Sequence, residues 1–305
     1  MTSFYSHYRG PQGIIGIAIS QDQSATNQLV GNAEGAALWP PASMAGIPIV
    51  LSPNSTGDFV VQACLKSQGF NVEDVEFIYE QQAGCLEALT SGDNGTSADL
   101  GGLWAPNTYT LLNLVEGAQT LCSGASVYAT VTGGQMARRE FAEANPETVA
   151  KFLSAWLRAI DFINNDENQE EVLDYMAAFY EEHDVDIPRP SLELDLRLVG
   201  LFGLEEQLDL MERRGSPPTS NYDIWTNEVA NFMLNNGVIS ELVSPTTYID
   251  DQYMQMVNMD PALKSYATGE EATGELAAPA SAAGAARGGS ALAGAVVGGL
   301  LAVAF

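Results

Sequence analysis

The chain has 305 residues, of which 39 are acidic and 12 are basic, so its formal net charge is −27. This charge argues against a nucleic-acid partner and against binding of an anionic membrane through basic patches. Hydrophobic residues make up 46 % of the sequence, which is enough to form the core of two lobes or of one large domain. Three cysteines allow at most one disulfide, and two histidines provide little material for metal sites or histidine catalysis. We expect no metal and no cofactor.

Residues 11–45 predict one or two strands separated by loops, and the strongest of these is the apolar run Ile14–Ile19. The first 20 residues lack the basic region and the small-residue cleavage site that frame a secretion signal.

The stretch Ile47–Phe70 is the most informative part of the sequence. Alternating apolar residues up to Leu51 predict a short buried strand, and the sequence SPNSTG at residues 52–57 predicts a hydroxyl-rich turn. A helix is expected to follow and to end at Gly69. Strand, turn and helix in this order can form an anion site, because the first helical N–H groups have no partner within the helix.

The hydroxyl groups of Ser55 and Thr56 could add donors to such an anion site. No basic residue lies between Arg9 and Lys66, so neutral donors would have to hold the anion. The alternative is that Ser55 or Thr56 only caps its own helix. The residue pattern leaves both interpretations open.

The next elements repeat the order of strand and helix. Val75–Tyr79 predicts a strand, Ala83–Leu89 a short helix, Ala98–Trp104 a buried strand, and Pro106 the first turn of another helix. This alternation predicts an α/β sheet with parallel strand pairs.

Beyond about Thr132 the sequence becomes helical. Asn145 and Pro146 predict the start of a long amphipathic helix, and a second helix is expected around residues 172–180. Ser191 is predicted to cap a leucine-rich helix over residues 192–211. Two further helices are expected over residues 224–235 and 248–256.

From Ala267 onward the composition is dominated by alanine and glycine, which predicts disorder. The small residues around Ser281 and the apolar end Ala291–Phe305 match the pattern of a glycolipid-anchor signal. A weak tail anchor and simple low complexity are the alternatives. Asn54 and Asn94 each begin an N-glycosylation sequon.

With these elements in place, the chain resembles the substrate-binding proteins of transporters for taurine, alkanesulfonates and nitrate. Four stretches carry the resemblance, and they are MAGIPIVLSPNSTGDFVVQACLKSQGFNVEDVEFIY, CLEALTSGDNGTSADLGGLWAPNTYTLL, ARREFAEANPETVAKFLSAWLRAIDFIN and NEVANFMLNNGVISELVSPTTYIDDQYMQMV. The resemblance covers about residues 45–257. It implies a two-lobed periplasmic-binding-protein-like type II fold of the α/β class, in which a ligand is held between the lobes.

The resemblance also implies site residues. The family's Ser-Thr loop corresponds to Ser55 and Thr56 with Gly57 beside them, and its aromatic residue to Trp104, with Asp99 on the same strand. The region Val131–Gln135 lacks the acidic residue that taurine binders of this family carry. A related sulfonate or another small anion is therefore expected as readily as taurine.

The resemblance further implies a division of the chain. We expect a remnant of the first lobe at residues 1–45, because the family has more chain before this point, and the second α/β lobe at 46–132. A helical return to the first lobe is expected at 133–266, a disordered linker at 267–290 and a hydrophobic tail at 291–305.

The sequence thus predicts a non-enzymatic solute-binding protein, which would lie outside the cytoplasm on a membrane and would work with a transporter. One alternative is a surface-displayed interaction protein that has lost its ligand. The other is an enzyme similar to thiamine-pyrimidine synthases, which is the least favoured because this chain lacks their cysteine-rich motif.

Overall fold

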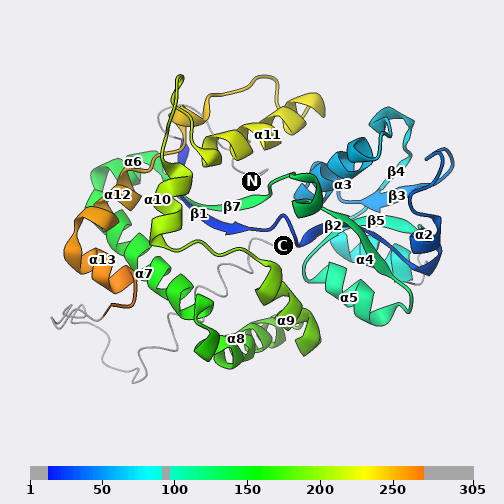
Figure 1. Ribbon diagram of the computed structural model, residues 1–305, viewed down its shortest axis with the longest axis horizontal. Helices are drawn as coiled ribbons and strands as arrows, with labels where there is room; N and C mark the ends of the chain where they lie inside the picture. Colours follow the sequence, from blue (N-terminus) through cyan, green and yellow to red (C-terminus); the bar gives the residue numbers. More distant parts are fainter. Residues whose placement is uncertain (1–12, 91–96, 271–305) are drawn as a thin grey trace.

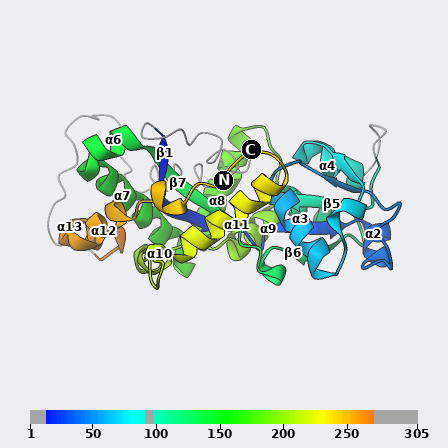
Figure 2. The same ribbon diagram turned by 90° about the horizontal axis from the view of Figure 1, so that it is seen from above.

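The computed structural model describes residues 13–90 and 97–270. Figure 1 shows two lobes side by side. One lobe is a sheet covered by helices on both faces, and the other lobe is mainly helical. We call residues 27–131, apart from 91–96, the sheet lobe, and we call residues 13–22 and 132–270 the helical lobe. Figure 2 shows from above that the lobes lie along one long axis, with α11 (Asn221–Asn235) reaching from the helical lobe toward α3 (Thr56–Ser67).

The strands are β1 (Ile14–Asp22), β2 (Asn27–Gly31), β3 (Ile49–Leu51), β4 (Phe77–Tyr79), β5 (Leu100–Trp104), β6 (Gln119–Ser123) and β7 (Thr132–Arg138). The other α-helices are α2 (Ala33–Leu38), α4 (Gln82–Thr90), α5 (Asn107–Leu114), α6 (Arg139–Ala144), α7 (Pro146–Asn164), α8 (Gln169–Glu182), α9 (Arg189–Leu198), α10 (Leu204–Met211), α12 (Gln252–Met259) and α13 (Pro261–Ala267). Short 3-10 turns lie at Val72–Asp74, Ala125–Val127, Asp166–Asn168 and Pro245–Thr247.

The sheet lobe is built on a five-stranded sheet in the order β4-β3-β5-β2-β6. β3 pairs in parallel with both β4 and β5, as the alternation of strands and helices predicts. β2 inserts antiparallel between β5 and β6. The expected domain boundary at residue 45 therefore does not coincide with a boundary of this sheet, because β2 precedes that residue and pairs within the sheet lobe.

Alternate residues of the central strands face opposite layers of helices. Leu29 and Leu51 pack with Val61 and Leu65 of α3, whereas Val30 and Val50 pack with α4 and α5. The side-chain period of two in a strand explains this division, because both faces of the sheet are buried.

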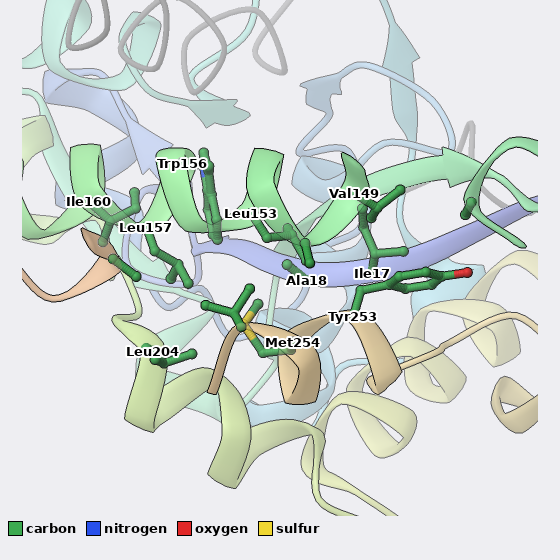
Figure 3. Packing of buried hydrophobic residues seen from close by; sticks show 14 of the residues in the cluster. Ile17, Ala18, Val149, Leu153, Trp156, Leu157, Ile160, Leu204, Tyr253 and Met254 are labelled. Carbon is green, nitrogen blue, oxygen red and sulfur yellow. The ribbon is translucent and has the colours of Figure 1, made fainter. Parts of the chain in front are cut away.

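The helical lobe packs its helices around the two-stranded sheet β1-β7. α7 begins at Pro146 after Asn145, as predicted, and buries its apolar stripe. Figure 3 shows Leu153 and Trp156 of α7 converging with Ile17 of β1 and Met254 of α12. The opposite edge of β1 is completed in part by a side chain, since the buried amide of Gln207 bonds both Ile19 N (2.9 Å) and Ile19 O.

Two predicted helices differ in the structure. The leucine-rich segment forms two helices, α9 and α10, and Ser191 lies inside the first turn of α9 instead of capping it. The break includes Gly200, whose backbone N–H and C=O bond Asp22 at the end of β1. Ala267, where disorder is predicted to begin, is the last residue of α13 and is 2 % exposed.

Several predictions lie outside the described residues, namely those on Asn94, Ser281 and the apolar tail 291–305. Within residues 13–90 and 97–270, no helix combines the length and the apolar character needed to cross a bilayer.

A disulfide joins Cys64 of α3 to Cys122 of β6, with 6.1 Å between their Cα atoms. It fixes α3 to the far strand of the sheet. Cys85 stays a buried free thiol.

We expect the double variant Cys64→Ser, Cys122→Ser to lose about 4 kcal/mol of unfolding free energy, because the bond closes a loop of 58 residues in the unfolded chain. Urea denaturation of the oxidised parent and of the variant measures this loss. Reductant should destabilise the parent and leave the variant unchanged, and equal midpoints for the oxidised and reduced parent would contradict the assignment.

Candidate functional site

The start of α3 lies at the edge of the sheet where the parallel strands β3 and β5 end. Ser55 is the N-cap, and its hydroxyl donates to Ser52 O (2.7 Å) and accepts from Asp58 N (3.1 Å). The Ser55 hydroxyl therefore caps its own helix. Its proton is used in the bond to Ser52 O and cannot be donated to a ligand at the same time. Helical bonding starts with Phe59 N to Ser55 O, so the N–H groups of Thr56 and Gly57 precede the first intrahelical donor.

Asp58 was not singled out from the sequence, although it is the charged group of this helix start. It is 3 % exposed, and its carboxylate accepts from Asn54 N (2.8 Å) and from Gln62 Nε2 (3.0 Å). Burial raises the pKa of Asp58, and these two hydrogen bonds partly oppose the shift. Lys66, at the far end of α3, is the one basic residue of the sequence between residues 27 and 131.

Trp104 ends β5 and lies directly against α3. A methyl group placed on Gly57 would lie 3.2 Å from Cε3 of the Trp104 indole and 3.5 Å from the Ser55 hydroxyl oxygen. The structure thus brings Ser55, Gly57 and Trp104 together, and their role in ligand binding stays a prediction. Thr56 is the first residue of α3 between Ser55 and Gly57.

Gln82 at the start of α4 holds the end of β5 in place. Its amide donates to Gly102 O (3.2 Å) and accepts from Trp104 N (3.2 Å). It also reaches the Ser52 hydroxyl at 3.4 Å, so one side chain links the ends of β3 and β5. Nothing in the sequence pattern distinguished Gln82 from a surface glutamine.

Asn27 is a further residue that the sequence reasoning missed. It begins β2 directly opposite Trp104 in the antiparallel pair, so the two side chains lie on the same face of the sheet. Asn27 is 1 % exposed, and its Nδ2 donates to Gln23 O (3.0 Å). Among the described residues its Oδ1 has no hydrogen-bond partner. The signal available in the sequence was its place in the polar run SQDQSATNQ at residues 20–28.

This polar run is the first of two crossings between the lobes. Six of its nine residues are buried, which is unusual for so polar a segment, and they are Ser20, Gln21, Ser24, Thr26, Asn27 and Gln28. The second crossing bonds to it, since Gln23 N donates to Val131 O (2.7 Å) and Val131 N donates to the Ser24 hydroxyl (2.9 Å). The hydroxyls of Ser20 and Thr132 are buried there without a partner in the described part of the chain.

Asp99 does not join this site. It precedes β5, whereas Trp104 is the last residue of that strand, so the two residues lie at opposite ends of β5. Its carboxylate accepts from Asn32 Nδ2 (3.1 Å), and its backbone oxygen accepts from Asn32 N (3.0 Å). Asp99 therefore braces the start of α2, away from Ser55.

The lobes touch beside the start of α3. Phe59 of α3 and Phe232 of α11 meet edge to face, with 5.5 Å between ring centroids. Asn236 Nδ2 lies 3.5 Å from Asn54 Oδ1. Asn54 is exposed, and the atom at this contact is its Oδ1, so glycosylation of its Nδ2 stays a prediction.

The lobes also touch on the other flank, where α9 packs against α5. Asn113 Nδ2 donates to the hydroxyl of buried Ser191 (2.7 Å). Burial raises the pKa of Asp195 in α9 to about 7. Burial, followed by the negative charge of Asp195, also raises the pKa of Tyr109 in α5 and of Tyr180 in α8.

We expect Asp195→Asn to raise the unfolding temperature at pH 8 and to leave it nearly unchanged at pH 4. The pKa of Asp195 is about 7 in the folded state and 3.8 in the unfolded state, so its burial costs little stability near pH 4, the cost grows as the pH rises from 3.8 to 7, and it is constant above pH 7. Thermal denaturation followed by circular dichroism at both pH values measures the difference. An equal effect at pH 4 and pH 8 would contradict a desolvated carboxylate at this contact.

The comparisons with known proteins can be set beside this geometry. A family model described as "NMT1/THI5 like" matches residues 12–170. A search among curated proteins gave no match. The periplasmic aliphatic sulphonate binding protein SsuA from Escherichia coli superposes with a TM-score of 0.60 at 14 % identity, covering 81 % of this chain and 71 % of that one.

Two further solved structures share this fold. The alkanesulfonate-binding protein SsuA from Xanthomonas axonopodis pv. citri, bound to MOPS, gives a TM-score of 0.54 at 11 % identity, covering 78 % of this chain and 73 % of that one. The desulfurization enzyme DSZB gives 0.52 at 13 % identity, covering 84 % and 82 %. At these identities the likeness establishes the fold alone, and it confirms the predicted two-lobed α/β class.

Proposed function

This chain belongs to the NMT1/THI5-like family, and from that premise we propose that it binds a small solute between its two lobes without chemically changing it. The observation that carries the proposal is the contact of the Trp104 indole with Gly57, at a helix start whose first N–H groups are not used within the helix. The buried oxygen of Asn27, which has no hydrogen-bond partner within residues 13–90 and 97–270, lies on the same sheet face and is a second and independent sign of a ligand.

We propose that the solute carries a small anionic group, such as a sulfonate, and that nitrate-like or taurine-like molecules are within its range. The N–H groups of Thr56 and Gly57 and the helix dipole would stabilise the negative group. The apolar part would lie against the Trp104 indole. The relatives whose names state a sulfonate ligand support this chemistry.

Several observations support a place outside the cytoplasm. Disulfides persist mainly in oxidising compartments, and Cys64 and Cys122 form one. The E. coli neighbour is periplasmic. We therefore propose an extracytoplasmic solute receptor that delivers its ligand to a membrane transporter. Attachment through the C-terminal tail stays a prediction.

An enzyme on this fold is the alternative, and the likeness to DSZB is the observation that favours it. The residues offer this reading little support. Burial raises the pKa of the Cys85 thiol to about 11, which keeps it protonated at neutral pH. His183 lies at the C-terminal end of α8 in the helical lobe, where it contacts Phe179.

The test is a thermal-shift and calorimetry panel of ethanesulfonate, 2-aminoethanesulfonate, nitrate and sulfate. A solute at a hundredfold excess over Kd should stabilise the folded chain by about 2.7 kcal/mol. Trp104→Ala should weaken binding of the sulfonate that binds best by roughly 1.5–3 kcal/mol, because it removes the apolar wall.

Trp39→Ala is the matched control, since Trp39 packs against Phe70 beyond the opposite end of β2. It should change stability but not affinity. The proposal would be rejected if no member of the panel bound, or if Trp39→Ala and Trp104→Ala weakened binding equally.

A further inference from the structure

Asn27 carries an acceptor that the fold leaves unused. The orientation of its amide is defined, because Nδ2 donates to Gln23 O at 3.0 Å and Oδ1 must therefore occupy the other position. The backbone of Asn27 is fully engaged, since its N–H donates to Gln23 O and its C=O accepts from Gly124 N. The side chain is 1 % exposed, and Oδ1 has no donor within the described residues. An acceptor buried in this way is destabilising unless something donates to it.

The pairing of β2 with β5 fixes the direction in which this acceptor points. Asn27 is the cross-strand neighbour of Trp104, and residues directly opposite in an antiparallel pair have Cβ atoms about 4.5–5.5 Å apart on one face. Leu29, two residues along β2, packs in the core beneath α3, so the shared face is the one that α3 covers. Trp104 contacts Gly57 of that helix. Asn27 and the start of α3 therefore lie on either side of one indole.

We propose that Asn27 is a specificity-determining residue, and that the solute presents an N–H or O–H donor to its Oδ1. This inference rests on the proposed solute-binding function. The amide oxygen only accepts hydrogen bonds, whereas nitrate, sulfate and unsubstituted alkanesulfonates only offer acceptors at neutral pH. Such anions would leave Oδ1 unpaired on closure. A solute with a hydroxyl or amine at one end and an anionic group at the other can donate to Asn27 on one side of the indole and accept from the start of α3 on the other.

The charges around the site agree with this choice. The carboxylate of Asp58 lies in the first turn of α3, and Lys66 at the other end of the helix is the one basic residue in the sequence from 27 to 131. An anion without a donor group would meet the negative field of Asp58, which the neutral N–H groups of the site do not cancel. A donor group, and an ammonium above all, lowers that cost.

The experiment compares ethanesulfonate with 2-hydroxyethanesulfonate, which differ by one hydroxyl, by calorimetry on the full chain. The wild-type protein should bind the hydroxylated molecule at least tenfold more tightly. Asn27→Leu, which is similar in volume and has no acceptor, should reduce this ratio to about one. Asn32→Leu is the control, because Asn32 lies at the opposite edge of the sheet and bonds Asp99, and it should keep the wild-type ratio.

If Asn27→Leu does not fold, because it removes the bond from Nδ2 to Gln23 O, the ratio measured on the wild-type chain still decides the question. Asn27→Asp also lacks that donor, but it keeps an acceptor at this position and adds a charge, so it should raise the affinity for 2-aminoethanesulfonate relative to 2-hydroxyethanesulfonate.

Equal binding of ethanesulfonate and 2-hydroxyethanesulfonate by the wild-type chain would overturn this inference and leave the solute-binding function standing. An unchanged amine-to-hydroxyl ratio in Asn27→Asp would also overturn it. Absence of binding for every sulfonate, nitrate and sulfate would reject the function itself.

Discussion

The pairing of β5 with both β3 and β2 is the constraint on which the site depends. The parallel pair β3-β5 brings the turn before α3 to the same sheet edge as Trp104. The antiparallel pair β2-β5 then sets Asn27 opposite Trp104. Because successive side chains of a strand point to opposite faces, a shift of one residue in either register would turn the indole to the face covered by α4 and α5, away from α3.

Glycines at the centre of β5 allow this arrangement. A methyl group on Gly102 would lie 2.8 Å from Val61 of α3 and 3.1 Å from Leu51 of β3. α3 can therefore approach the sheet closely, and its first turn reaches the Trp104 indole at the end of the strand. The disulfide between Cys64 and Cys122 holds the other end of the same helix. The helix whose start is proposed to bind the anion is thus held by its packing on β5 and by the disulfide to β6.

The two lobes meet on both sides of the crossing segments. The aromatic pair Phe59 and Phe232 closes one flank, and the bond between Asn113 and Ser191 closes the other. Between them, the two crossing strands bond to each other through Ser24 and Val131. Under the proposed function, separation of one flank is the hinge motion that would admit a solute beside Trp104.

Much of this fold could be predicted from the sequence, because its signals are local. The apolar period around Ile49, the glycine stop at Gly69 and the Asn145–Pro146 start each depend on neighbouring residues. Ser55, Gly57 and Trp104 are assigned to one site only through the resemblance, whose Ser-Thr loop and aromatic residue correspond to these positions. β6 and β7 were missed, since neither Gln119–Ser123 nor Thr132–Arg138 carries a clear apolar alternation.

The polar part of the site was harder to predict, because the role of each polar residue depends on residues far away in the sequence. Asn27 is unremarkable in sequence, and only its burial opposite Trp104 reveals an unused acceptor. Asp99 was expected on the strand that carries Trp104, but five residues of extended chain separate the two edges of the sheet. The capping role of Ser55 likewise depends on the bond to Ser52 O, which the pattern left open.

The most direct measurement of the central claim is a crystal structure of the chain grown with a sulfonate solute. We predict density for the sulfonate group within hydrogen-bond distance of the backbone N–H groups of Thr56 and Gly57, with the organic part against the Trp104 indole. A solute bound elsewhere on the molecule, with the Trp104 surroundings unchanged, would contradict the account.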